Sequence, residues 1–241
     1  MKKKLKKDIN NKSSLMRNFK IALSDLKPIK TYFWFSFFLF FFVAVIGLIF
    51  PIFFEDNILE LIKDLIDKTE GLGFVGLTRF IIFNNVQSAF LGMVLGIFLA
   101  VFPISVIIVN AYVLGFVADK SIAVEGILVL WRLLPHGILE IPAILISVAL
   151  GIKIGIELMT NCIFYYNKKI NNLSLSLLIL LSIIFLPISF IVYMVISLSD
   201  NKLRIKLIDN LIYSFRIFVF IVLPMLIVAG IIEGSLIWLL G

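Results

Sequence analysis

The sequence predicts an all-α fold: a polytopic bundle of about five transmembrane helices with a broken or re-entrant central region. Two observations lead to this prediction. Of the 241 residues, 61% are hydrophobic and only 15% are charged, whereas soluble domains are about 45–50% apolar and about 25% charged. Several uncharged stretches are also long enough to cross a bilayer, which takes roughly 20 apolar residues. Composition therefore excludes a soluble enzyme and places the chain in a membrane.

Positive charge is concentrated at the N-terminus. Residues 1–30 hold ten Lys and Arg residues against Asp8 and Asp25, although the whole chain has a formal net charge of only +7. A basic segment before a membrane span indicates a cytoplasmic N-terminus in contact with anionic lipids of the cell membrane. Nucleic acid is not expected as a partner, because no aromatic or motif pattern accompanies the lysines. The expected organisation is a basic segment, 1–30, followed by a transmembrane domain, 31–241.

An amphipathic helix is predicted within the basic segment, over residues 13–27. Pro28 ends it, because proline cannot continue a helix. The apolar stripe of this helix consists of Leu15, Phe19, Ala22, Leu23 and Leu26. Such a helix either lies on the cytoplasmic leaflet or packs on the cytoplasmic ends of the bundle, and the spacing alone leaves both possibilities open.

The first expected span is 31–54, whose 24 residues would form a helix of ~36 Å. An acidic stretch follows, in which an external amphipathic helix is expected at about 57–70. Gly71 suits the end of that helix. Its apolar stripe repeats at helical spacing through Ile58, Leu61, Ile62, Leu65 and Ile66.

Residues 80–118 carry no charge at all. A single helix of this length would measure ~58 Å, nearly twice the ~30 Å core of a bilayer. The segment must therefore tilt, protrude or break, and Pro103 is the expected hinge. The favoured arrangement treats 84–118 as one span, and the alternative splits it at Pro103 into two crossings.

Three further spans are expected at about 126–156, 173–198 and 212–240. The first of them contains Pro135, Gly137 and Pro142, so part of the central region is expected to be re-entrant. Counting the Lys and Arg residues of the loops favours five spans, with the N-terminus in the cytoplasm and the C-terminus outside. The split at Pro103 gives six spans instead.

Small residues recur at intervals of four in three segments. Such ridges allow membrane helices to approach closely. The three ridges are Gly92, Gly96 and Ala100; Ala111 and Gly115; and Gly151 and Gly155. Packing within the chain is the favoured interpretation, and homodimerisation is the second.

The polar residues that are hardest to place in a membrane lie in the sequence Leu134-Pro-His-Gly-Ile-Leu-Glu-Ile-Pro142. His136, the one histidine of the chain, and Glu140 are a helical turn apart and share one face. A carboxylate at bilayer depth costs at least a few kcal/mol unless it is paired, protonated or hydrated. The pair therefore needs an explanation.

Three uses of this pair are open: a hydrogen bond that locks a broken helix, which is favoured; two ligands of a divalent metal such as zinc; or a proton-relay or substrate-binding pair. Zinc takes four ligands, so a metal site needs more carboxylates, such as Glu233 or Glu125, or a second copy of the chain. The metalloprotease motif H-E-x-x-H is absent, because Gly137 follows His136. No catalytic residues are assigned, and a non-enzymatic role is favoured.

From about residue 31 to its C-terminus, the chain resembles the stage II sporulation protein M family of integral membrane proteins. One departure is Ala111, where the family pattern has glycine. The residues that carry the resemblance are Ile82-Phe-Asn-Asn85, the Gly92/Gly96 helix, Asn110 followed by Gly115, Pro135-His-Gly-Ile-Leu-Glu-Ile-Pro-Ala143, and Ala229-Gly-Ile-Ile-Glu233. His136 and Glu140 match the most specific element of the family, whose chemistry the resemblance does not define.

The resemblance implies an all-helical membrane bundle. In spore-forming bacteria, family members work with two peptidoglycan-degrading partners as the membrane anchor of that complex; members also occur in archaea and in bacteria that never sporulate. We therefore expect a homodimeric membrane protein that anchors or organises a partner complex, with protein partners on the outer or cytoplasmic face. A transporter or channel with a mid-membrane polar site is the alternative, and an intramembrane metalloenzyme is a third hypothesis.

Overall fold

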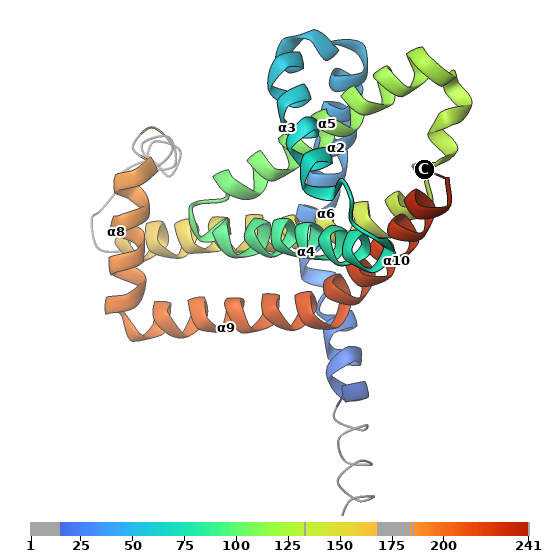
Figure 1. Ribbon diagram of the computed structural model, residues 1–241. Helices are drawn as coiled ribbons and strands as arrows, with labels where there is room; N and C mark the ends of the chain where they lie inside the picture. The colour runs from blue at the N-terminus through green and yellow to red at the C-terminus, as the bar shows by residue number, and fades with distance from the viewer. Residues whose placement is uncertain (1–14, 133, 168–183, 185, 241) are drawn as a thin grey trace, which may run out of the picture.

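Figure 1 shows the computed structural model, which describes residues 15–132, 134–167, 184 and 186–240; the side chains of residues 53, 131–136, 165–167, 186 and 240 lie outside this description. Every element of the described part is helical, which confirms the predicted all-α class. After a helical stretch at 15–24, the elements are η1 (Lys27–Ile29), α2 (Lys30–Ile49), η2 (Pro51–Phe54), α3 (Glu55–Thr69), α4 (Phe74–Val94), η3 (Leu95–Ile97), α5 (Val101–Glu125), η4 (Ile127–Arg132), α6 (Leu134–Asn167), α8 (Leu186–Ser199), α9 (Asn201–Ile217), the π-helix η5 (Phe218–Val222) and α10 (Leu223–Leu240).

Within the described residues, five helical stretches are long and apolar enough to span a membrane, as predicted. These candidate spans are Leu15–Ile49, Phe74–Ile97, Val101–Glu125, Gly137–Phe164 and Asn201–Leu239. The number agrees with the prediction, but two of the segments differ from those expected.

The first difference is the uncharged segment 84–118, which forms two helices rather than one span. The break lies at Leu99 and Ala100, whose φ angles of +56° and +67° are left-handed and end the helical path. Pro103 lies three residues further on, in the first turn of α5, where a missing N–H costs nothing. The prediction of one helical span over 84–118 is therefore wrong: the segment forms two helices, each part of a separate candidate span, and the hinge precedes the proline.

The second difference concerns the segment 173–198. Residues 173–183 and 185 fall outside the described residues, and the rest of the segment lies mainly in α8, a helix of 14 residues. The fifth candidate span is instead the long stretch Asn201–Leu239. Its π-helix η5 ends at Val222, and Leu223 and Pro224 follow directly. Proline cannot donate to the carbonyl four residues earlier, and the wider turn of a π-helix accommodates that gap.

The predicted helix at 57–70 is confirmed as α3, and Gly71 follows it with a left-handed φ of +74°. One edge of its apolar stripe faces the bundle through Ile58, which is buried, whereas Leu61 and Ile66 on the other edge are exposed. Lys120 of α5 ties the start of α3 to the bundle through an ion pair with Glu55 at 2.6 Å. The helix is therefore attached along one side only.

The small-residue ridges pack against each other within the chain, which confirms the favoured interpretation. A Cβ atom on Gly96 would collide with the backbone of Gly151, and one on Gly155 would collide with the backbone of Ala100. In the same way, Gly115 of α5 leaves no room for a Cβ atom against Ala44 of α2. These contacts hold α6 against the α4–α5 turn, and α5 against α2.

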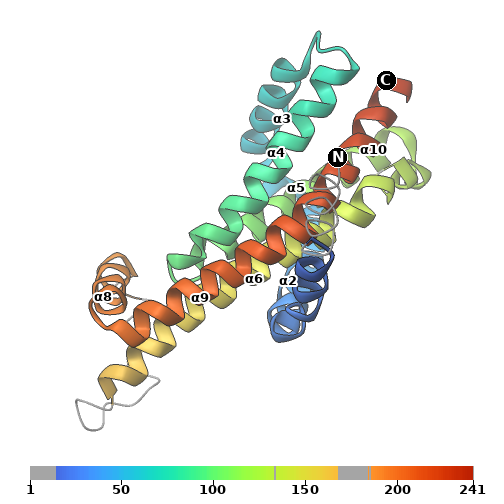
Figure 2. The same cartoon turned by 90° about the horizontal axis from the view of Figure 1, so that it is seen from below.

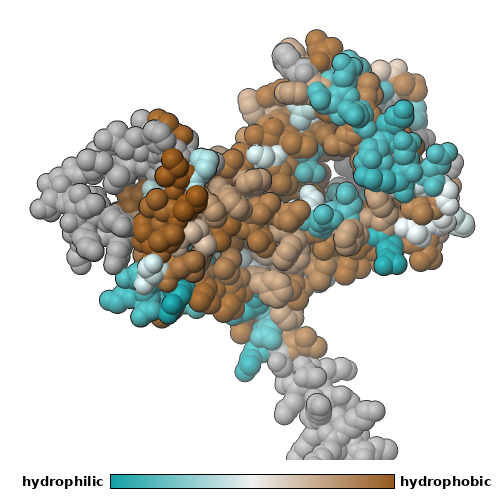
Figure 3. Space-filling model, turned by 60° about the vertical axis from the view of Figure 1, so that its left-hand side comes forward, coloured by the Kyte–Doolittle hydropathy of each residue, from teal (hydrophilic) through white to brown (hydrophobic). Residues whose placement is uncertain are grey.

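The long helices run in two main directions. In Figures 1 and 2, α4, α6 and α9 run beside one another, and α2 crosses them, with α3 at one end of α2 and α5. The space-filling view shows a largely apolar body with hydrophilic side chains gathered above and along its lower edge (Figure 3). The exposed phenylalanines Phe38 and Phe42 of α2 belong to this apolar surface. Such a surface is suited to contact with lipid rather than water.

Candidate functional site

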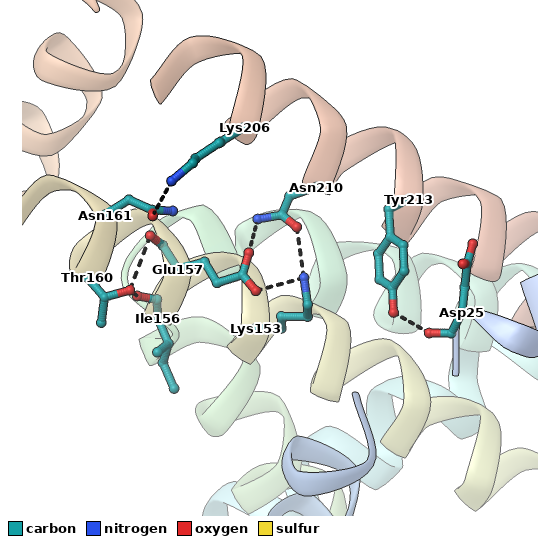
Figure 4. Close-up of polar contacts among 9 residues, drawn as sticks. All are labelled: Asp25, Lys153, Ile156, Glu157, Thr160, Asn161, Lys206, Asn210 and Tyr213. Carbon is teal, nitrogen blue, oxygen red and sulfur yellow. Dashed lines mark hydrogen bonds and ion pairs between the residues drawn. The ribbon is translucent and has the colours of Figure 1, made fainter. Parts of the chain in front are cut away.

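The most extensive polar cluster of the described bundle joins α6 to α9 (Figure 4). Lys153 and Glu157 are one turn apart on α6, and their side chains form an ion pair of 2.9 Å between Nζ and Oε1. Asn210 of α9 contacts both: its Oδ1 accepts a hydrogen bond from Lys153 Nζ at 2.8 Å, and its Nδ2 donates to Glu157 Oε2. We call these three residues the α6–α9 cluster.

The local sequence explains why the cluster forms. Residues at i and i+4 of a helix share one face, so Lys153 and Glu157 project together from an otherwise apolar helix. The Lys153 side chain is only 10% exposed, and burying an unpaired ammonium group would cost several kcal/mol. Its Nζ also lies 4.8 Å from the ring centroid of Tyr213, which adds a cation–π contact. The positive and negative charges therefore compensate each other inside the chain.

The cluster continues toward the N-terminal helical stretch. The hydroxyl of Tyr213 donates to the backbone carbonyl of Asp25, and Arg216 Nη1 lies 3.1 Å from Asp25 Oδ2. Ala22, one turn before Asp25, is fully buried. The C-terminal end of the predicted amphipathic helix thus packs on the bundle, while its apolar residue Leu15 at the other end is exposed.

Two of the three predicted site residues, Glu140 in the second turn of α6 and Glu233 of α10, are partly buried on helices that pack against each other. The Oε2 atom of Glu233 is buried and has no hydrogen-bond partner among the described residues. Two ionised carboxylates repel each other in apolar surroundings.

The side chain of His136, the third predicted site residue, lies outside the described part of the structure. Its pairing with Glu140 therefore stays a prediction. Among the side chains that are described, no group of three or more His, Cys, Asp or Glu residues is placed to hold a metal ion. The proposed metal site of His136, Glu140 and Glu233 likewise stays a prediction.

Sequence reasoning did not identify the α6–α9 cluster. Lys153 and Glu157 have the same i, i+4 spacing in an apolar stretch as His136 and Glu140, and that spacing could have indicated a buried pair. Asn210 could not have been found in this way, because its position depends on how α9 packs along α6. The expected boundary at residue 156 also placed Glu157 just beyond the membrane.

Comparisons with known proteins agree with the helical membrane fold. A family model described as Stage II sporulation protein M matches residues 35–236. An uncharacterized protein of Methanocaldococcus jannaschii is 36% identical over 113 residues, which are 43% of this chain and 48% of that protein. The alignment thus spans about half the length of this relative. The search of solved structures found no match. Because the family model covers most of the chain, the protein belongs to the stage II sporulation protein M family.

Proposed function

We propose that the chain is a non-enzymatic membrane protein that anchors or organises a partner complex. The observation that carries this proposal is that Lys153 and Glu157 of α6 and Asn210 of α9 are bonded to one another. Such a cluster fixes the relative position of two helices, as an anchor requires. Membership of the family supports the same role, and a peptidoglycan-degrading partner is the family's precedent in spore-forming bacteria.

The partner-binding element of this proposal is α3. Residues 55–70 contain six carboxylates and two lysines, which sets this helix apart from the apolar body. Leu61 and Ile66 are exposed on it, so it offers apolar contacts beside negative charge. Anionic headgroups would repel such a surface, and a protein with basic and apolar residues complements it.

The proposed orientation places the N-terminus in the cytoplasm of a cell whose plasma membrane holds the protein. With the five candidate spans of the structure as the crossings, residues 1–14 and 168–169 and the basic starts of the first and fifth spans fall on one side. Residues 55–70 then fall on the opposite side. This distribution satisfies the rule that cytoplasmic loops carry the excess of Lys and Arg.

Co-purification from native membranes tests the proposed function. The full chain is compared with the double variant Glu60→Gln, Asp67→Asn on α3, both of which are exposed. We expect a specific protein to be recovered with the wild type and to fall at least about fivefold with the variant, which corresponds to a loss of ~1 kcal/mol. Asp209→Asn, at an exposed position of α9, is the matched control and should leave recovery unchanged.

The same experiment can contradict the proposal. Equal recovery of all proteins with wild type, variant and control would mean that α3 holds no partner. Homodimerisation belongs to the proposal as well, and the mass of the purified complex in detergent measures it. A monomeric mass in several mild detergents would contradict homodimerisation.

A transporter is the second candidate, and the Glu140–Glu233 pair favours it. Carriers place polar groups within the membrane beside interrupted helices, and here the pair lies in the same bundle as the break at Leu99 and Ala100. A flux assay in proteoliposomes distinguishes the two functions. Ion or proton movement that is lost in Glu233→Gln would support a transporter, and its absence would leave the anchor.

A further inference from the structure

A groove lies between α4 and α10. Its volume is about 620 Å³, and its walls are almost entirely apolar. Ile82 and Val86 of α4 line one side, and Ile227 and Ile231 of α10 line the other. The two helices are in close contact beside the groove, because Gly230 packs directly on Ile82 and Gly234 on Thr78. The groove is therefore part of the packed bundle.

Arg79 is the one charged residue that lines the groove. It is exposed and lies within the candidate span Phe74–Ile97. None of the ion pairs formed among the described residues includes it. A guanidinium group in or near a bilayer is costly unless it reaches an anion or water. Arg79 thus calls for an anionic partner that the described part of the chain does not supply.

The aromatic residues at one end of the groove indicate where it lies in a membrane. Phe74 of α4 and Trp238 of α10 contact each other at one end, with their ring centroids 5.9 Å apart. Aromatic residues of this kind gather at the level of the lipid headgroups. From Val75 to Val86 the helix rises ~17 Å, which is close to half of the ~30 Å hydrocarbon core. The groove therefore extends through about one leaflet, with Arg79 near its headgroup end.

We propose that this groove binds an anionic phospholipid, whose apolar chain lies between α4 and α10 and whose phosphate pairs with Arg79. Both parts of the lipid meet a matching surface. Its acyl chain packs against the apolar walls of the groove, and the guanidinium donates two parallel hydrogen bonds to phosphate oxygens. This binding site is separate from α3 and does not depend on the proposed partner complex.

Native mass spectrometry of the full chain in detergent tests the proposal. The protein is titrated with phosphatidylglycerol and with phosphatidylcholine of the same chain length. We expect the wild type to bind phosphatidylglycerol about fivefold more tightly than phosphatidylcholine, because one arginine near an anionic headgroup contributes about 1 kcal/mol. Arg79→Gln should abolish this preference. Arg204→Gln is the matched control, because Arg204 is exposed on α9, away from the groove lining, and its side chain donates to Asn201.

A second set of variants tests the apolar part. Filling the groove with Ile227→Trp or Ile231→Phe should reduce retention of both lipids at least about threefold. Should neither variant fold, quenching of Trp238 fluorescence by phosphatidylglycerol with a brominated chain, in a background of Trp34→Phe and Trp131→Phe, reports on the same site. We expect Arg79→Gln to weaken that quenching.

Four results would overturn the proposal. The wild type could show no preference between the two lipids, or Arg204→Gln could reduce the preference as much as Arg79→Gln, which would indicate diffuse surface charge. Glycerol phosphate could displace the lipid completely at low concentration, which would indicate a site for a free phosphate. An acidic protein segment could occupy the groove in place of lipid.

Discussion

Lys153 and Glu157 of α6 form an ion pair of 2.9 Å within the bundle, with side chains that are 10% and 33% exposed. Asn210 of α9 bonds to both of them. The three residues give α6 and α9 a fixed register, because sliding one helix along the other by a turn would separate the charges from the amide. This relationship makes the cluster a structural lock, and it leads to the first prediction.

Removing one member of the lock should cost more than removing both charges. In Lys153→Met, the Glu157 carboxylate loses its counter-charge. We expect the free energy of unfolding to fall by about 2–3 kcal/mol. This loss is smaller than for a fully buried ion pair, because the Glu157 carboxylate is partly exposed. The double variant Lys153→Met, Glu157→Met should recover part of the loss. Unfolding in mixed micelles measures both values.

Lys206→Met is the matched control, because Lys206 is exposed and bonds to Asn161 at 3.3 Å at the rim of the same two helices. It should change stability by no more than about 1 kcal/mol. If Lys153→Met were as mild as this control, the cluster would not lock α6 to α9.

The contact of Asp25 with α9 should hold the N-terminal helical stretch against the bundle. In Asp25→Ala, the ion pair with Arg216 is lost, while the backbone carbonyl of Asp25 still accepts from Tyr213. We expect amide exchange of residues 15–25 to accelerate about threefold to tenfold. Hydrogen–deuterium exchange measures this, and Tyr213→Phe should have a similar effect. Unchanged exchange in both variants would argue against the contact.

Close packing of α4 on α6 should make Gly151 intolerant of any side chain. In Gly151→Ala, the added Cβ meets the backbone of Gly92 and Met93 and the ring of Pro103, and we expect a loss of about 1–3 kcal/mol in stability. Gly76→Ala is the control, because its Cβ would make only an ordinary contact with Leu72 at 3.4 Å.

The same pair of variants separates internal packing from dimerisation. Thermal unfolding and the mass of the complex are measured together. A change of mass in Gly151→Ala without loss of stability would assign the glycine ridge to contacts between copies of the chain.

The predicted bond between His136 and Glu140 is tested by substitution and metal removal. The favoured interpretation is a hydrogen-bonded lock, so His136→Ala should lower stability by about 1–3 kcal/mol, and treatment with a chelator should leave the thermal midpoint of the wild type unchanged. A chelator effect that disappears in Glu233→Gln would instead establish a metal site that includes Glu233. Elemental analysis of the purified protein provides the independent readout.

Much of the fold could be predicted because hydrophobicity and charge act over whole segments. The all-α class, five candidate spans and the amphipathic α3 all follow from such patterns. The break between α4 and α5 could not be placed, because its physical cause is tertiary. Leu99 and Ala100 are held in left-handed conformations at a point where Gly155 packs on the backbone of Ala100, whereas Pro103 fits a first helical turn.

The candidate site was predictable to a similar extent. Its polar residues stand out in an apolar sequence, and the proposed grouping of His136, Glu140 and Glu233 stays a prediction. The contacts of Lys153 with Asn210 and of Asp25 with Tyr213 and Arg216 were not predictable, because these partners lie on α9, which is distant in sequence. Spacing identifies residues that share a helix face, and only tertiary packing determines which face of another helix they meet.

Photo-crosslinking in living cells tests most directly whether the bundle presents α3 to a protein partner. A photoreactive amino acid is placed at Leu61, on the exposed edge of α3, and in a second variant at Phe42, on the exposed apolar surface of α2. We predict a protein adduct of defined mass at position 61 and adducts with lipid alone at position 42. Lipid adducts alone at both positions would show that α3 lies on the membrane, and would contradict its role as the docking element of an anchor.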